Sequence, residues 1–361
     1  MMKNSQKGTL KEVLIPSKDT PDEWESESDP QKMHDLLLQR NADHLLKSSH
    51  SINSSRGHFD DLIGDYGAPN EAVVDSILSG TFDTEQLKRS YPEFGDLVPE
   101  FVQSMASPTI TSKGINETKA AFKWKFGEKE FCNLFKKTWE STSCGPSGLH
   151  MSHWKAATER PAIAQMYSFF MWAAFKFGFI YDRWAVSWHC MIQKKDKPYI
   201  NKLRIVQLFE GFFNGGLKYL LGRKLMYHII DTGQMDGETF GSIQGKSAQE
   251  AMSLVLQMVY NVHCLNKTPL AVVFNDADGC YNRIKALMAE LAARQVGCPK
   301  NIVRVHTSAQ QHMKHYIRTA AGISSGYVQW IKTQHQNISY DQEGLISSIL
   351  ANIGVVAQSY G

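Results

Sequence analysis

Hydrophobic positions recur along this chain with helical spacing in several stretches. In HDLLLQRNADHLL four leucines lie near one helix face, and EAVVDSILSG predicts a second helix that stops at its final glycine. Further helices are predicted over residues 117–141, 163–177 and 217–230. By contrast, residues 191–210 have the pattern of two strands joined by the turn DKPYIN. The first 30 residues are polar and acidic and predict a disordered lead.

A second strand signal ends in a carboxylate. Ala271 to Phe274 are uncharged strand formers, which predicts a strand buried on both faces that delivers Asp276 to its carboxyl end. Gly279 allows the chain to turn there, and a helical pattern starts near Arg283. An Asp in this place suits a divalent-metal site that orients phosphates. Taken alone, however, an Asp in such a segment is more often a turn former or a helix cap than a metal ligand.

The residues around Asp276 resemble the first carboxylate motif of retrotransposon reverse transcriptases. In that motif an apolar strand leads to Asp, then three residues, a small residue, an aromatic residue, and Asp or Asn. The matching positions here are Asp276, Cys280, Tyr281 and Asn282. The phrase Asn-Asp-Ala, two residues, Cys-Tyr is most similar to that of non-LTR elements.

Three upstream segments resemble further motifs of the same family, in the family's order. CGPSGLHMSHWKA (144–156) is similar to the first fingers motif, and MIQKKDKPYINKLRIVQLFE (191–210) to the next. FGSIQGKSAQEA (240–251) looks like the segment that precedes the catalytic strand. Together the resemblance covers roughly residues 33–329.

The resemblance implies an α+β fold, with a helix-rich N-terminal part followed by the fingers and a partial palm of a right-hand polymerase. It divides the chain into an acidic lead (1–30), a helical region (31–116), a fingers-like part (117–270), a partial palm (271–330) and an unassigned tail (331–361). YIRTAAGISSGYVQW (316–330) looks like the hairpin that precedes the family's Gly-Gln-Gly motif.

The resemblance also implies roles for the residues after the strand. Asp276 would bind two Mg²⁺ ions that activate the primer hydroxyl and stabilise the leaving pyrophosphate, and the carbonyl of Ala277 would complete one metal site. The amides of Gly279 and Cys280 would contact the triphosphate. The ring of Tyr281 would lie under the sugar, where a 2′-hydroxyl collides with it.

Basic residues in the fingers-like segment suit the same substrate. A triphosphate is neutralised well by a lysine point charge together with a planar arginine. Lys194 or Lys195 and Arg204 lie on the two predicted strands, close enough to face one nucleotide. The alternative is an ordinary charged hairpin.

The chain also departs from the family. Neither the Gly-Gln-Gly motif nor the aromatic-x-Asp-Asp strand follows Asp276. One Asp cannot hold two cations at a separation of about 3.5–4 Å. The sequence therefore predicts an incomplete, inactive reverse-transcriptase domain, and the alternative is a catalytically dead relic that binds nucleic acid.

Charge changes this picture through its distribution. The chain has a net charge of +3, but its first 100 residues hold 10 Lys and Arg against 19 Asp and Glu, a net of −9, so the remainder carries +12. Phosphate contacts supply most non-specific affinity for nucleic acid. This charge fits the partners that the resemblance implies, an RNA template and a DNA primer, and the deoxynucleoside triphosphates that it implies as substrates. Solubilising lysines scattered over the surface are the alternative.

Several other signals are weaker. GSIQGKS (241–247) resembles a phosphate-binding loop but has three residues, where four are required, between its glycines. The six cysteines are widely spaced, which argues against a zinc ribbon and favours an intracellular setting. The apolar stretch Ile163–Tyr181 is interrupted by polar residues and predicts a buried helix and no membrane span. His150 and His153 favour polar packing over metal binding.

Overall fold

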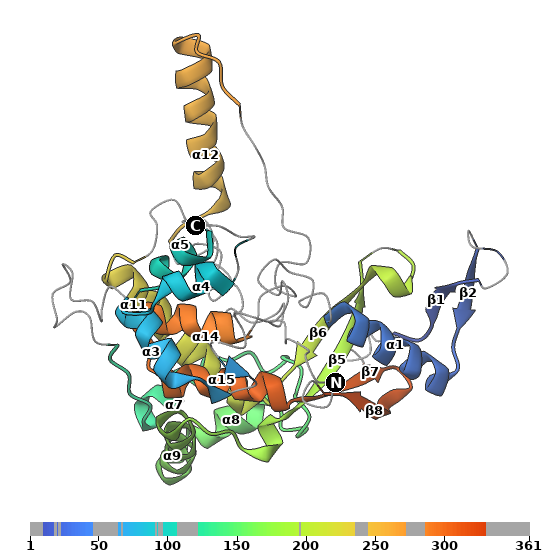
Figure 1. The fold of residues 1–361 in the computed structure, drawn as a ribbon. Helices are drawn as coiled ribbons and strands as arrows, with labels where there is room; N and C mark the ends of the chain where they lie inside the picture. The colour runs from blue at the N-terminus through green and yellow to red at the C-terminus, as the bar shows by residue number, and fades with distance from the viewer. Residues whose placement is uncertain are drawn as a thin grey trace.

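The computed structural model shows a helical body joined to a small sheet that is covered on one side by an N-terminal helix (Figure 1). The structure describes residues 10–17, 20, 23–45, 64–65, 68–90, 92, 97–106, 122–194, 196–234, 245–271 and 286–329. These ranges contain both α-helices and β-strands, so the broad α+β prediction is confirmed.

Within the described part of the chain, four strands form the larger sheet in the order β6-β5-β7-β8. Strands β5 (Val186–Gln193) and β6 (Leu203–Leu208) form an antiparallel hairpin, as the sequence predicts. Strand β7 (Lys314–Thr319) lies parallel to β5 and pairs antiparallel with β8 (Gly322–Val328). The hairpin predicted near residues 316–330 is therefore confirmed. The β7–β8 hairpin belongs to the same sheet as the β5–β6 hairpin. The predicted boundary between the fingers-like part and the partial palm, at residue 270, therefore does not separate two sheets.

The N-terminal segment forms part of this fold. Strands β1 (Val13–Pro16) and β2 (Trp24–Glu27) pair antiparallel, and helix α1 (Pro30–Leu45) follows them. The prediction of a disordered lead is therefore wrong for these strands. Leu10 and Val13 are buried in a hydrophobic cluster with residues of α1 and β5, and their burial offsets the entropy cost of ordering the segment.

The helical body contains most of the remaining elements. They are β3 (Gly64–Asp65), β4 (Ala68–Pro69), α3 (Glu71–Ser79), α4 (Thr84–Ser90), α5 (Leu97–Ser104), α7 (Glu128–Phe135), α8 (Met151–Ala157), α9 (Pro161–Phe177), η4 (Asp182–Trp184), α10 (Gly211–Leu217), η6 (Lys218–Lys224), α11 (Leu225–Asp231), α14 (Ala286–Gln295) and α15 (Lys300–His312). The short segment η5 (Ile200–Lys202) lies instead in the connection from β5 to β6 and packs against β1 and α1. The predicted helix over 217–230 is confirmed, because α10, η6 and α11 follow one another without a break. Its centre is a π-helical segment.

Local signals set several helix ends where they were predicted. Asn70 caps α3 by accepting a hydrogen bond from the Val73 amide, and Gly80 ends the helix with a φ of 71° that favours glycine. Gly178 ends α9 in the same way, with a φ of 74°. These ends depend on neighbouring residues only, so the sequence reports them directly.

The predicted helix over 117–141 is wrong in its extent, because among its described residues only α7 is helical. Before α7, residues 122–126 form neither helix nor strand, with Phe126 buried and Lys123 and Lys125 exposed. An alternation of period two is a strand-like pattern, and the chain becomes helical only after Gly127.

Close helix packing in the body requires small residues on α10. A Cβ atom at Gly216 would overlap the sulfur of Met171 on α9, and one at Gly215 would lie 2.7 Å from the ring of Phe135. In the same core, the ring of Trp154 stacks on the ring of Phe212, with ring centroids 5.0 Å apart. The segment that resembles the first fingers motif therefore packs into an aromatic core, whereas Met191 and Leu203 of the next segment belong to the cluster around Leu10 and Val13.

Helix α12 (Ala248–Met258) and the π-helical segment η7 (Val259–Leu265) project from the body (Figure 1). Ser247 and Glu250 form a capping box at the start of α12. Within the described part of the chain, no helix combines the length and the apolar composition that crossing a bilayer requires.

Candidate nucleic-acid interface

The two faces of the four-stranded sheet differ in burial. Alternate residues of β5 and β7 point to opposite faces, and the strand register places Ser187 beside His315 and Trp188 beside Tyr316. Helix α1 covers the face that contains His315, as shown by the 2.9 Å hydrogen bond between His34 and Thr319. We call this the inner face. The opposite, outer face has a different composition.

The inner face combines apolar residues, among them Met191 and Ile317, with buried polar groups. The rings of His189 and His315 stack with their centroids 4.5 Å apart, and the Nδ1 atom of His315 lies 2.8 Å from the hydroxyl of Ser187. Burial lowers the pKa of His315 to about 3, and burial beside His315 lowers the pKa of His189 well below its usual value. Both imidazoles are therefore uncharged at neutral pH.

The outer face carries positive charge and aromatic rings. The strand register places on it the side chains of Trp188, Arg204, Lys314, Tyr316, Arg318 and Tyr327. None of the four strands contains an Asp or a Glu. Among the described residues, no carboxylate lies within salt-bridge distance of the three cations. Such a surface attracts anions.

Two of these cations contact aromatic rings. The guanidinium carbon of Arg318 lies 4.7 Å from the centroid of the Trp188 ring. The ammonium group of Lys314 lies 5.2 Å from the centroid of the Tyr327 ring, which in turn lies 5.4 Å from that of Tyr316. These distances are within the range of cation–π attraction, so the rings help to position the charges.

The predicted triphosphate-binding residues are only partly described. Arg204 lies on β6 opposite Ile192, with its side chain exposed on the outer face. Lys194 follows β5 directly, is exposed, and donates its backbone N–H to the carbonyl of Lys202 at 3.2 Å. The two cations therefore belong to one hairpin, as predicted. Lys195 lies outside the described residues.

The two segments that resemble fingers motifs contact each other. A Cβ atom at Gly145, in the Gly-Pro-Ser-Gly turn, would overlap the carbonyl oxygen of Phe209, which follows β6. The next residue, Glu210, is fully buried and accepts a 3.0 Å hydrogen bond from Arg183. Only glycine fits at position 145, so the spacing of this turn from β6 depends on the absence of a side chain.

The predicted catalytic segment lies outside the described residues. This applies to Asp276, Ala277, Gly279, Cys280 and Tyr281, so the predicted two-metal site stays a prediction. Within the described ranges, no group of three or more His, Cys, Asp or Glu could hold a metal ion. The His150–His153 pair there forms a helix cap, in which His153 accepts the backbone N–H of His150 at 3.1 Å.

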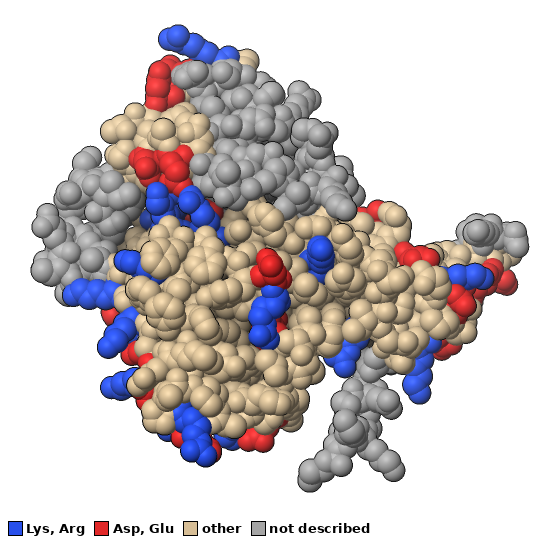
Figure 2. All heavy atoms as spheres, turned by 90° about the horizontal axis from the view of Figure 1, so that it is seen from below, with Lys and Arg blue, Asp and Glu red and all other residues tan. Residues whose placement is uncertain are grey.

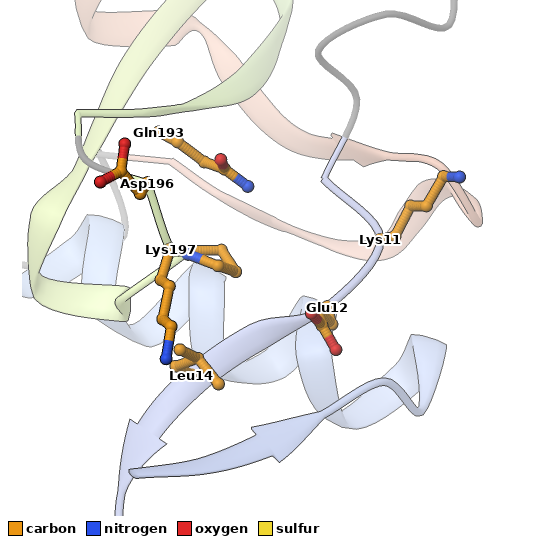
Figure 3. Close-up of a pocket in the computed structure, with 7 residues that line it drawn as sticks. Lys11, Glu12, Leu14, Gln193, Asp196 and Lys197 are labelled. Atoms are coloured by element: carbon orange, nitrogen blue, oxygen red, sulfur yellow. The ribbon is translucent and has the colours of Figure 1, made fainter.

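A cavity of about 470 Å³ lies between β1 and the connection from β5 to β6 (Figure 3). Lys11 and Lys197 line it together with Glu12 and Asp196, so its charges cancel. A triphosphate needs an excess of positive charge, so this cavity is a poor match for a nucleotide.

The charge of the helical body is dispersed. Seen from below, Lys and Arg side chains are scattered between neutral and acidic ones and do not merge into one patch (Figure 2). The positive charge of the chain beyond residue 100 is therefore not concentrated on that face. The outer face of the sheet differs because its three cations stand without acidic neighbours in the strands.

Comparison with known proteins adds no relative. No protein-family model matches the chain, and no curated protein matches it.

Of the outer-face residues, the sequence singled out only Arg204 as a predicted binding residue. A pattern is visible in residues 314–319, Lys-His-Tyr-Ile-Arg-Thr. There the half-buried residues Lys314, Tyr316 and Arg318 alternate with the buried residues His315, Ile317 and Thr319. This pattern predicts a strand with one basic, aromatic face. It does not indicate that β7 lies beside β5.

Proposed function

We propose that this chain is the fingers-containing part of an RNA-directed DNA polymerase domain, related to those of non-LTR retrotransposons. The observation that carries the proposal is the contact between two segments that resemble consecutive family motifs, at Gly145 and Phe209. The outer face of the sheet adds support, because its cations have the charge that nucleic acid requires.

In this proposal the β5–β6 hairpin binds the incoming nucleotide. Arg204, with Lys194 or Lys195, contacts the triphosphate, since a planar guanidinium and an ammonium group complement its oxygens. The RNA template and DNA primer bind along the same basic side of the sheet. Gly279, Cys280 and Tyr281 then contact the nucleotide from the segment after the predicted catalytic strand.

Magnesium is the cofactor that the resemblance implies, and it would be held by Asp276 and the carbonyl of Ala277. These donors do not fit a two-metal site by themselves, because the 361 residues contain one of the two family carboxylate motifs. We therefore assign no catalytic step to this chain alone. The same observation favours a second candidate, a relic that binds nucleic acid without chemistry.

A completed chain tests the proposal. The 361 residues would be followed by a segment with the missing Gly-Gln-Gly and Asp-Asp motifs, and primer extension on RNA would be measured with Mg²⁺. Extension that is lost in Asp276→Ala supports the polymerase. Binding of an RNA–DNA hybrid without extension supports the relic, and absence of binding at low salt contradicts both candidates.

A further inference from the structure

A row of three aromatic residues crosses the outer face of the sheet. Trp188 on β5 pairs with Tyr316 on β7, and Tyr316 pairs with Tyr327 on β8. Neighbouring strands lie about 4.8 Å apart, so the row extends over about 10 Å. Lys314 and Arg318 occupy the same face, two residues to either side of Tyr316.

This row is separate from the hydrophobic cores. None of the three aromatic residues belongs to either core cluster, and each is half-buried. Ile192 and Ile323, on the same face, are 45% and 47% exposed. Aromatic rings in a packed core are usually covered by apolar neighbours. Here the described residues next to the rings include two cations.

The chemistry of the row suits unpaired bases. Each base has a π-face that stacks on an aromatic ring, and the adjoining phosphates attract lysine and arginine. A guanidinium that stacks on a ring uses its face, so its N–H donors can still reach a phosphate oxygen. In a duplex the bases are already stacked on each other, and only the phosphates remain to be bound.

We infer that the Trp188–Tyr316–Tyr327 row, with Lys314 and Arg318, binds a single-stranded stretch of nucleic acid of two or three nucleotides. The inference deepens the proposed function and shares its premise that nucleic acid is the substrate. It assigns the aromatic row across β5, β7 and β8 to unpaired bases, and leaves the nucleotide to Lys194 and Arg204.

Binding of two probes to the full chain tests this inference. The probes are a fluorescein-labelled single-stranded RNA of about 12 nucleotides and the same RNA fully paired with DNA, because binding sites of this kind cover about 4–16 nucleotides. Tyr316→Ala should weaken binding of the single strand about ten-fold and leave the hybrid near its wild-type affinity. Tyr316→Phe retains the ring and should behave like the wild type.

Matched controls come from helix α9. Phe169 is 58% exposed and lies away from the sheet, so Phe169→Ala should leave single-strand binding unchanged. Arg318→Gln should reduce the slope of log K against log salt by about 0.7, as expected for one lost phosphate contact to a single strand. Lys176→Gln removes an exposed cation of α9 and should leave the slope unchanged.

Photo-crosslinking gives a second readout that needs no variant to fold. RNA with 5-iodouridine should crosslink to the wild-type chain at Tyr316, within the tryptic peptide 315–318, or at Trp188 or Tyr327. Crosslinks confined to other elements would overturn the inference, as would an equal loss of affinity for both probes in Tyr316→Ala.

The binding data also separate the inference from the proposed function. If the hybrid binds and Tyr316→Ala changes the affinity for neither probe, the inference fails and the proposed function stands. If neither probe binds at low salt, both fail. Equal competition by polyglutamate would identify a general anion surface and also overturn the inference.

Discussion

Gly145 lies directly against the carbonyl group of Phe209, at the point where β6 passes towards α10. A side chain at this glycine would meet backbone atoms that have little freedom to move. Gly145→Ala should therefore lower the free energy of unfolding by about 3 kcal/mol, the upper part of the range for overpacking. Thermal or urea unfolding followed by circular dichroism would measure the change.

Gly148, in the same turn, provides the control for this variant. Among the residues that the structure describes, no atom lies within 4 Å of a Cβ built there, so the cost comes from its φ of 71°. Gly148→Ala should cost about 1 kcal/mol. If the two variants are equally destabilised, the contact with Phe209 is not the reason that position 145 is glycine.

Acidification should destabilise the fold through its buried histidines. Burial lowers the pKa of His306 to about 4 and that of His315 to about 3. An unfolded histidine titrates near pH 6.5, so below this pH the unfolded chain binds more protons than the folded one. The free energy of unfolding should decrease as the pH falls from about 7 to 4, by about 2 kcal/mol per imidazole at pH 5.

Urea unfolding at several pH values would check this dependence. His306→Gln should make the dependence shallower, because one imidazole no longer takes up a proton on unfolding. His312→Gln removes an exposed imidazole from the same helix, α15, and is the matched control for the loss of a histidine. A stability that stays constant between pH 7 and 5 would contradict the assignment of these histidines as buried and neutral.

Arg204 should contribute to triphosphate binding. Hydrogen bonds to charged groups contribute about 1.5–3 kcal/mol, so Arg204→Gln should weaken the binding of a deoxynucleoside triphosphate by about ten-fold or more. Isothermal titration calorimetry would measure the dissociation constant. Arg160→Gln removes an exposed arginine at the start of α9 and should have no effect. If Arg204→Gln and Arg160→Gln bind the triphosphate equally well, Arg204 does not contact it, and the β5–β6 hairpin is an ordinary charged hairpin.

Tyr281 should select against ribonucleotides in the completed chain. The resemblance places its ring under the sugar, so Tyr281→Ala should remove the collision with the 2′-hydroxyl. The ratio of kcat/KM for a deoxynucleotide to that for the matching ribonucleotide should then fall. Tyr281→Phe keeps the ring and should retain the wild-type ratio. If the ratio of the two kcat/KM values is unchanged in Tyr281→Ala, Tyr281 does not select against ribonucleotides.

The sequence by itself determined the elements that depend on neighbouring residues. The stop of α3 at Gly80 and the β5–β6 hairpin were predicted from the residues, because turns and caps depend on the local backbone, whereas the β7–β8 hairpin was predicted from the family resemblance. Arg204 and Lys194 were placed on one hairpin for the same reason. The acidic composition of the lead concealed the apolar residues Leu10 and Val13, whose burial needs a partner elsewhere in the chain.

Only the tertiary structure decided which residues share the outer face. Trp188 and Tyr316 belong to distant parts of the chain and become neighbours because β7 pairs parallel to β5. Parallel strands require a crossover connection, so no local turn signal announces their pairing. Helix α1 then covers the inner face, and this choice leaves Arg204, Lys314 and Arg318 on the exposed side. Burial of one face of a sheet is a property of the assembled fold, since the same alternation along a strand allows either face to be covered.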